Sequence, residues 1–311
     1  MFKYTLYSFT ALFFGLLLVT CKSETSKQTK DKISNNLVID VITEAMEFQM
    51  IDTIPSGWNT FRYKNLSHEV HFFILEKLPN GIRLENYKNE LVPPFIKATE
   101  YMLAGNMEEG FKQFENIPKW FDSIEVSGGV GLVSPNSTAK STIYLKPGIY
   151  AMECYIRMPN GMAHAFFGML KEVIVLDTKS TISEPEANIN ISISSTKGII
   201  LKDSITKGKH IFKVDFKDQI KYETMLGHDI NLIKVNNPKL LDTVNTWINA
   251  ADLNSLRSPS PKGVTFLGGV NDCQEGTSGY FYAEITSGQY ALISEVPNAK
   301  SRNMLLPFTV K

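Results

Sequence analysis

The chain is poor in the residues that several protein classes need. Its 311 residues include only three cysteines and five histidines, and lysine plus arginine equals aspartate plus glutamate at 32 each. Three cysteines cannot build the dense disulfide framework of a small secreted domain. A neutral chain without a basic block has no stretch suited to nucleic-acid phosphates, so we expect no nucleic-acid partner. The G-x-S-x-G and G-K-[ST] motifs of serine hydrolases and phosphate-binding loops are also missing.

Apolar runs long enough to span a bilayer are absent after the N-terminus. There, Lys3 precedes an apolar run that ends at Val19, as in a secretory signal. The following LVTC sequence resembles the lipobox of bacterial lipoproteins, although Thr20 stands where Gly, Ala or Ser is usual. The resemblance implies a signal peptide over residues 1–21 and lipidation of Cys21. An uncleaved membrane anchor and a plain secretory signal are the alternatives.

Residues 22–40 are predicted to form a flexible tether, because this polar segment has few large apolar groups to bury. A lipid on Cys21 would hold the chain at a membrane surface without spanning the bilayer. We therefore expect a location in the cell envelope, on a bacterial membrane that faces the periplasm or the cell surface.

An internal repeat divides the rest of the chain. Residues 128–154 and 268–294 share Gly-Gly-Val and Gly-x-Tyr-Ala at the same spacing, without a gap. The boundary falls near residues 176–188. The repeat predicts two related domains, at residues 41–178 and 185–311.

Each domain is predicted to be a β-sandwich with a helical insertion. Short alternating strands separated by Gly and Pro turns are typical of sandwiches and barrels. The insertion is expected at residues 84–121 in the first domain and at 238–256 in the second. The expected fold class is all-β, with two tandem Greek-key β-sandwiches.

Four residues of the first domain occur in an order typical of one metal-binding family. An N-x5-H-x3-L pattern contains His71, a P-G-x-Y-x3-C pattern ends at Cys154, and an H-x4-M pattern joins His164 to Met169. This order resembles the cupredoxins over about residues 41–178. The resemblance implies one mononuclear copper ion held by these four residues in the first domain. It also implies that both domains are cupredoxin-like.

Copper chemistry explains such a set of residue types. A blue-copper centre uses two imidazoles and a thiolate in a trigonal plane, with a weak axial thioether. The loop between Cys154 and His164 is longer than in small electron-transfer cupredoxins. Its length and its H-x3-G-M ending resemble those of copper nitrite reductases.

Simpler interpretations exist for each residue alone. A single strand histidine is usually a hydrogen-bonded residue, Met169 fits core packing, and Cys154 fits a buried structural thiol. A disulfide between Cys154 and Cys273 is disfavoured because the two cysteines fall in different domains. His68 is expected on the opposite strand face from His71 and exposed to solvent.

The second domain lacks two of the four ligands. His228 and Met304 correspond to His71 and Met169, but Ser294 replaces the cysteine and Ala299 the second histidine. Cys273 is at no ligand position and is expected to be a half-buried free thiol. Two-domain copper enzymes need a second centre built from additional histidines, so five histidines without an H-x-H motif predict a protein that is not an enzyme.

The expected function is electron transfer in the cell envelope with a redox partner protein. One alternative is copper handling, in which Cu(I) is stored or delivered to an exchange partner with help from Met158 and Met162. Another is a metal-free interaction module. Its binding surface would be the helical insertion, which carries the aromatic residues Tyr101, Phe111, Phe114 and Trp120.

Overall fold

The computed structural model describes residues 38–311, which are mostly β-strands with two short helical regions. This confirms the predicted all-β fold class with a helical insertion in each half. The predicted signal peptide, Cys21 and most of the tether lie outside the described residues. Within residues 38–311, no helix is long and apolar enough to cross a membrane.

The first half of the described chain carries seven strands and the larger insertion. Its strands are β1 (Val38–Thr43), β2 (Thr53–Asn65), β3 (His71–Lys77), β4 (Glu125–Val133), β5 (Ser137–Leu145), β6 (Gly148–Glu153) and β7 (Leu170–Lys179). Its helical elements are α1 (Leu84–Asn86), η1 (Tyr87–Leu91), α2 (Val92–Leu103), α3 (Met107–Gln113), η2 (Phe114–Asn116), η3 (Lys119–Ser123) and η4 (His164–Phe167).

The second half follows the same order with a shorter insertion. Its strands are β8 (Ile189–Ser194), β9 (Gly198–Leu201), β10 (Gly208–Phe216), β11 (Ile230–Val235), β12 (Val264–Val270), β13 (Ser278–Ile285), β14 (Gly288–Ile293) and β15 (Leu305–Val310). Its helical elements are α4 (Leu240–Trp247) and η5 (Ala299–Arg302).

The strands pair edge to edge across both halves. One run pairs β15-β14-β11-β12-β4-β3-β6-β7, and a second pairs β2-β5-β13-β10-β8-β9. Strand β2 belongs to both runs, because its first residues pair with β7 and those from Gly57 onward pair with β5. Gly57 has φ +93°, a conformation that a residue with a Cβ rarely adopts, and it permits the change of partner.

The halves join through β4 with β12 and through β5 with β13. At the first junction the Ser134 amide donates a hydrogen bond to the Phe266 carbonyl at 3.1 Å. The Phe266 amide donates a second hydrogen bond to the Ser134 hydroxyl at 2.8 Å. Asn231 of β11 is buried and accepts the Leu132 amide of β4 at 2.7 Å through its side-chain oxygen. The domain boundaries predicted from the repeat stay a prediction.

The Gly-Gly-Val motif occurs where two strands come close. A Cβ added to Gly129 would lie 1.9 Å from the Phe73 carbonyl oxygen, and one added to Gly269 would lie 1.8 Å from the Ile230 carbonyl oxygen. Real Cβ atoms do not approach a carbonyl oxygen so closely. The second glycine of each motif is therefore required for β4 to lie beside β3 and for β12 to lie beside β11.

The first strand begins inside the predicted tether. Residues 38–40 belong to β1, which pairs in parallel with β2 and buries Ile39, Val41 and Thr43 on one face. The predicted tether therefore extends three residues too far, because the alternating side chains of β1 have apolar partners in the sandwich.

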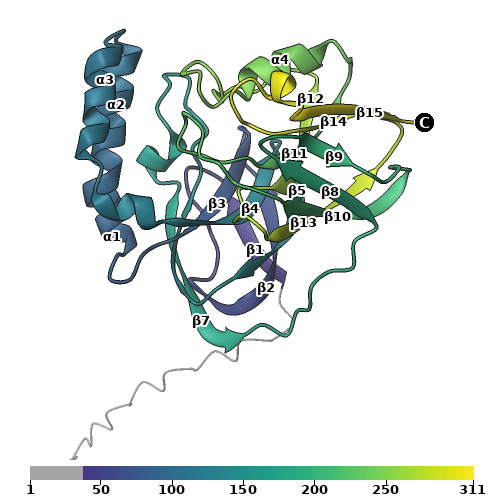
Figure 1. Cartoon of the computed structure of the whole chain (residues 1–311), viewed down its shortest axis with the longest axis horizontal. Coiled ribbons are helices and arrows are strands. Elements are labelled where there is room, and N and C mark those ends of the chain that lie inside the picture. The colour runs from purple at the N-terminus through teal and green to yellow at the C-terminus, as the bar shows by residue number, and fades with distance from the viewer. Residues whose placement is uncertain (1–37) are drawn as a thin grey trace, which may run out of the picture. The chain divides into compact units, whose positions relative to one another are not determined.

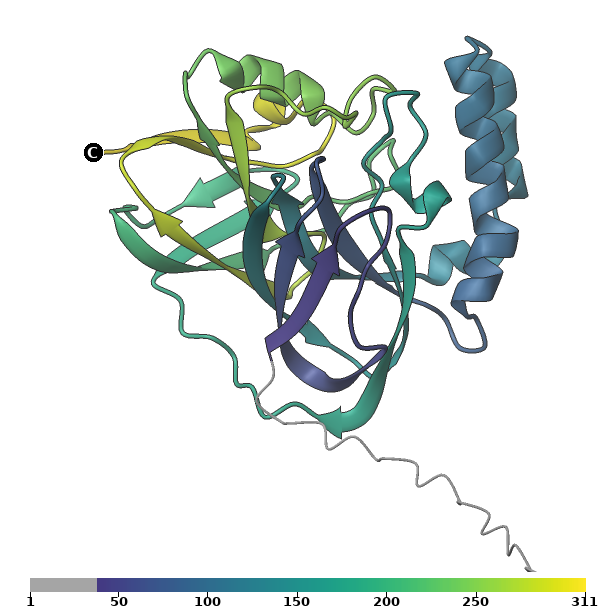
Figure 2. The same cartoon turned by 180° about the vertical axis from the view of Figure 1, so that it is seen from behind.

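The larger insertion lies at one side of the strands, as Figures 1 and 2 show for α1, α2 and α3. Tyr87, Leu91 and Ala98 are buried. Tyr101 and Phe111 are exposed.

Asn231 is expected to be important for joining the halves. The Asn231→Ala variant leaves the Leu132 amide without its acceptor, and a buried unpaired amide costs about 1–3 kcal/mol. We predict a loss of that size in the free energy of unfolding, measured by urea denaturation. The matched control is exposed Asn254→Ala, expected within about 0.5 kcal/mol of the native chain. Equal loss in both variants would contradict this role.

Candidate metal centre

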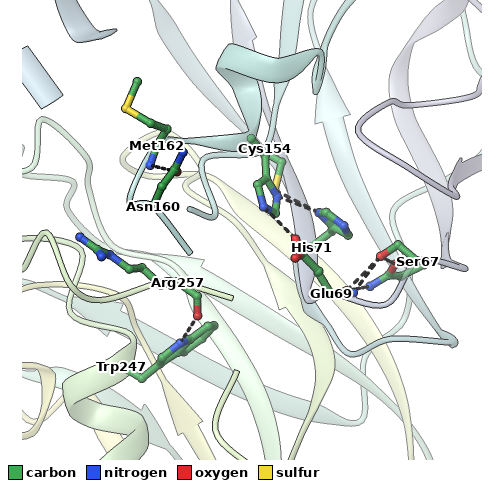
Figure 3. Close-up of polar contacts among 10 residues, drawn as sticks. Ser67, Glu69, His71, Cys154, Asn160, Met162, Trp247 and Arg257 are labelled. Carbon is green, nitrogen blue, oxygen red and sulfur yellow. Dashed lines mark hydrogen bonds and ion pairs between the residues drawn. The ribbon is translucent and has the colours of Figure 1, made fainter. Parts of the chain in front are cut away.

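Three buried side chains from separate elements meet near one end of the first half. His71 is the first residue of β3, Cys154 follows the last residue of β6, and His164 is the first residue of η4. His71 is 1% exposed, and both Cys154 and His164 are 0% exposed. Figure 3 shows His71, Cys154 and Glu69 gathered together, while Met162 and Arg257 lie apart.

Two of the three separations between the donor atoms suit a three-coordinate metal ion. The Nδ1 atoms of His71 and His164 are 3.2 Å apart, and Cys154 Sγ is 3.8 Å from His71 Nδ1. The three donor atoms lie within 4.8 Å of one another, and no other group within residues 38–311 has this arrangement. With metal–nitrogen bonds of about 2.0 Å and a metal–sulfur bond of about 2.3 Å, the 3.2 and 3.8 Å separations correspond to angles of about 105° and about 125° at the ion. The widest separation in the cluster, 4.8 Å, exceeds the roughly 4.3 Å that one nitrogen bond and one sulfur bond can span, so the donors would have to move closer together to hold one ion. The residue types and the two shorter separations fit a His-His-Cys site.

Backbone hydrogen bonds close the ligand loop, residues 154–169, on itself. The Cys154 amide donates to the Met169 carbonyl and the Met169 amide to the His164 carbonyl, both at 3.3 Å. The Ala165 amide donates to the Cys154 carbonyl at 2.9 Å. Met169 is fully buried immediately before β7. Its main chain thus joins both loop residues of the cluster.

Burial keeps both imidazoles neutral. It lowers the pKa of His71 to about 3, with the nearby His164 adding a smaller effect, and lowers the pKa of His164 to about 4. Burial also raises the pKa of the Cys154 thiol to about 12. Metal binding requires neutral imidazoles and a thiolate, so a cation at this site would offset the cost of the thiolate charge.

Glu69 is a neighbour of the cluster that sequence reasoning missed. Its Oε2 lies 3.0 Å from His164 Nε2, the ring nitrogen that faces away from His71. The Glu69 main chain is fixed by bonds to Asn65 and Ser67. A carboxylate that accepts a hydrogen bond from a histidine orients the ring and increases its basicity. Here the two atoms are close, but neither has a hydrogen bond. The only available signal was an acidic residue two positions before His71.

The other sulfur and nitrogen candidates lie elsewhere. Cys273 is buried rather than half-buried, and neither it nor Cys154 is in a disulfide. His68 is exposed as predicted, but it lies in the bend before β3 and not on the strand. Met158 and Met162 are partly buried in the ligand loop, and Figure 3 shows the Met162 side chain directed away from Cys154.

The second half holds different side chains at the corresponding places. The Ser294 amide donates to the Met304 carbonyl at 3.0 Å and the Met304 amide to the Ala299 carbonyl at 2.8 Å, as in the ligand loop. The Ser294 hydroxyl instead donates to Asp229 at 2.8 Å. His228 is fully buried, and its Nε2 lies 3.6 Å from Asp218.

No family model and no curated protein matches the chain. Among solved structures, auracyanin B matches with a TM-score of 0.29 and 15% identity, over 42% of this chain and 95% of that one. Auracyanin A, described as a blue copper protein from Chloroflexus aurantiacus, matches with a TM-score of 0.28 and 18% identity, over 45% and 98%. The copper nitrite reductase of Nitrosomonas europaea matches with a TM-score of 0.22 and 9% identity, over 88% and 94%.

These matches contradict the expectation that the chain is not an enzyme. Copper nitrite reductases and multicopper oxidases are among the matched structures, so that expectation is withdrawn. It rested on the number of histidines in one chain, which is a weak ground. With TM-scores below 0.5, the chemistry of this chain has to be argued from its own residues.

The two neutral imidazoles predict a pH-dependent stability for the metal-free chain. The unfolded chain binds a proton at His71 as pH falls below about 6.5, whereas the folded chain does so only near the lowered pKa. This contribution to stability is present above pH 6.5 and is lost as pH falls.

We therefore predict that the stability difference between the native chain and His71→Gln shrinks by about 2 kcal/mol from pH 7 to pH 5. The measurement is urea unfolding with a chelator present. Leu132→Ala, at a buried apolar site in β4, is the control and should show a constant difference. A constant difference for His71→Gln as well would show that the folded imidazole titrates normally.

Proposed function

We propose that the chain binds one copper ion through His71, Cys154 and His164, with Met169 as a weak axial ligand, and transfers single electrons. The observation that carries the proposal is the buried His-His-Cys cluster with donor separations of 3.2 and 3.8 Å. Two imidazoles and one thiolate form a donor set that suits copper in both oxidation states. Copper supplies a one-electron Cu(II)/Cu(I) couple.

The protein would contribute a rigid and dry site. All three donors are buried, and the ligand loop is fixed by its own backbone hydrogen bonds. A site that does not rearrange between the two oxidation states keeps the reorganisation energy small. Glu69 would hold the His164 ring so that Nδ1 faces the ion.

The setting of this function is proposed from the N-terminal sequence. A signal that ends at a lipidated Cys21 would place the chain on a bacterial membrane, in the periplasm or at the cell surface. The partner would be a redox protein of the cell envelope. The repeat supports two tandem cupredoxin-like domains, of which only the first keeps the ligand set.

Copper addition should reveal the site directly. We predict that one equivalent of Cu(II) gives an intense visible thiolate-to-copper band, which Cys154→Ser abolishes. Copper at a hundredfold excess over its Kd should also raise the free energy of unfolding by about 2.7 kcal/mol. The matched control is Cys273→Ser, which removes the other buried cysteine of residues 38–311 and should keep the band.

Other outcomes separate the alternatives. A colourless protein with tight Cu(I) binding, measured by competition with a Cu(I) chelator, would support copper handling instead of electron transfer. A protein whose stability does not change with either copper ion would contradict both.

Met169 provides a test of the axial position. Met169→Leu keeps the apolar volume, and such swaps usually cost less than about 1.5 kcal/mol. Loss of the thioether removes a donor that stabilises Cu(II), so the reduction potential should rise in a redox titration of the visible band. Met304→Leu, the buried counterpart in the second half, should leave the potential unchanged. Equal potentials for the native chain and both variants would remove Met169 from the ligand set.

A further inference from the structure

A cavity of about 350 Å³ separates the larger insertion from the strands. Its walls come from the insertion, from the ligand loop, and from residues 221–226 and 250–256 of the second half. Figures 1 and 2 show the helices of the insertion standing beside the strands. The volume falls within the range of small-molecule sites.

Most of the cavity wall is apolar and aromatic. Leu91 and Phe95 line its inner part, while Met107 and Phe111 line it with exposed fractions of 43% and 59%. Large apolar side chains that remain exposed beside a cavity are typical of an entrance for an apolar ligand. An apolar body would therefore remove wall area from water on binding.

The polar part of the cavity is a pair of carboxyl groups. Glu76 of β3 and Glu153 of β6 both receive their hydrogen bond from one hydroxyl, that of Tyr87, at 2.9 and 3.1 Å. A hydroxyl has one proton and can donate it to one acceptor at a time. When both carboxyl groups are ionised, one of them therefore lacks a donor at any moment.

No cation of the described chain forms an ion pair with Glu76 or Glu153, although Lys221 lines the same cavity and its charge favours the ionised form of Glu76. Within residues 38–311, no Lys, Arg or His nitrogen lies within 4.0 Å of the Glu76 or Glu153 carboxyl group. Arg157 lines the cavity, but its guanidinium donates to the carbonyls of Asp252, Ser255 and Ala250. Burial, together with the neighbouring Glu153, raises the pKa of Glu76 well above its ordinary value. Buried carboxylates without a partner charge are costly, so the site is complementary to a cation.

We propose that this cavity binds a small amphipathic cation, namely a primary amine on an aromatic or alkyl body, with the ammonium group between Glu76 and Glu153. The ammonium group has three donors and can satisfy both carboxylates at once. The apolar body would pack against Leu91 and Phe95. An anionic ligand of the same shape would be repelled by the carboxyl pair.

The test uses three probes of one shape on the full chain without added copper. These are 4-phenylbutylamine, 4-phenylbutan-1-ol and 4-phenylbutanoate, titrated by calorimetry at pH 7. Charge-assisted hydrogen bonds contribute about 1.5–3 kcal/mol, so the amine should bind about ten- to hundredfold more tightly than the alcohol. The carboxylate should bind most weakly. Equal binding of amine and alcohol, or no binding of any probe, would overturn the proposal.

Variants locate the site. Glu76→Gln should reduce the preference for the amine over the alcohol at least about tenfold, because a neutral amide cannot pair with the ammonium group. Glu100→Gln, an exposed residue of the same insertion that does not line the cavity, is the matched control and should keep the preference. An unchanged preference in Glu76→Gln would overturn the proposal.

A second variant keeps the test valid if Glu76→Gln folds poorly. Thr99→Trp fills the cavity from α2 and leaves both carboxyl groups in place. It should abolish binding of both the amine and the alcohol, while the thermal unfolding midpoint stays close to that of the native chain. Retained amine binding would place the site elsewhere. Because copper is absent throughout, this result is independent of the proposed electron transfer.

Discussion

The closure of the ligand loop by backbone hydrogen bonds is the constraint on which the candidate metal centre depends. Cys154 and His164 are distant along the loop, yet both are bonded to the main chain of Met169. These bonds require no metal and no side-chain chemistry. The donor atoms therefore come together through the fold alone, and a bound ion would have to draw in only the widest of their separations.

The two halves have different polar groups at corresponding positions. In the first half, Cys154 and the two histidines form a cluster of donors without a charged partner other than Glu69. In the second half, the Ser294 hydroxyl is satisfied by Asp229, which also accepts the Glu295 amide. The Ser294 hydroxyl thus has an acceptor within the chain, whereas both ring nitrogens of His228, the counterpart of His71, have no hydrogen-bond partner.

The sequence predicted what depends on spacing along the chain. The order of strands and insertions along the chain and the meeting of His71, Cys154 and His164 agree with the motif spacing, and the antiparallel pairing of β3 with β6 brings the start of β3 beside the end of β6. The tether boundary was wrong by three residues, since the apolar alternation from Val38 was too short to recognise.

Contacts between distant residues could not be predicted in this way. Glu69 approaches His164 only because the bend before β3 is held by Asn65 and Ser67. The Glu76–Glu153 pair needs the adjacent pairing of β3 with β6, and Tyr87 arrives from the insertion. Nothing in the local pattern of these residues distinguishes them from surface acids.

The continuous pairing of strands across the halves has a consequence for how the chain unfolds. If the first half opened alone, β12 and β13 would lose their partners β4 and β5 and become free sheet edges. Unpaired edges invite pairing with other chains and leave backbone groups unsatisfied. Opening one half therefore removes support from the other, which couples the two into one cooperative unit. The half without the His-His-Cys cluster would in this way stabilise the half that contains it.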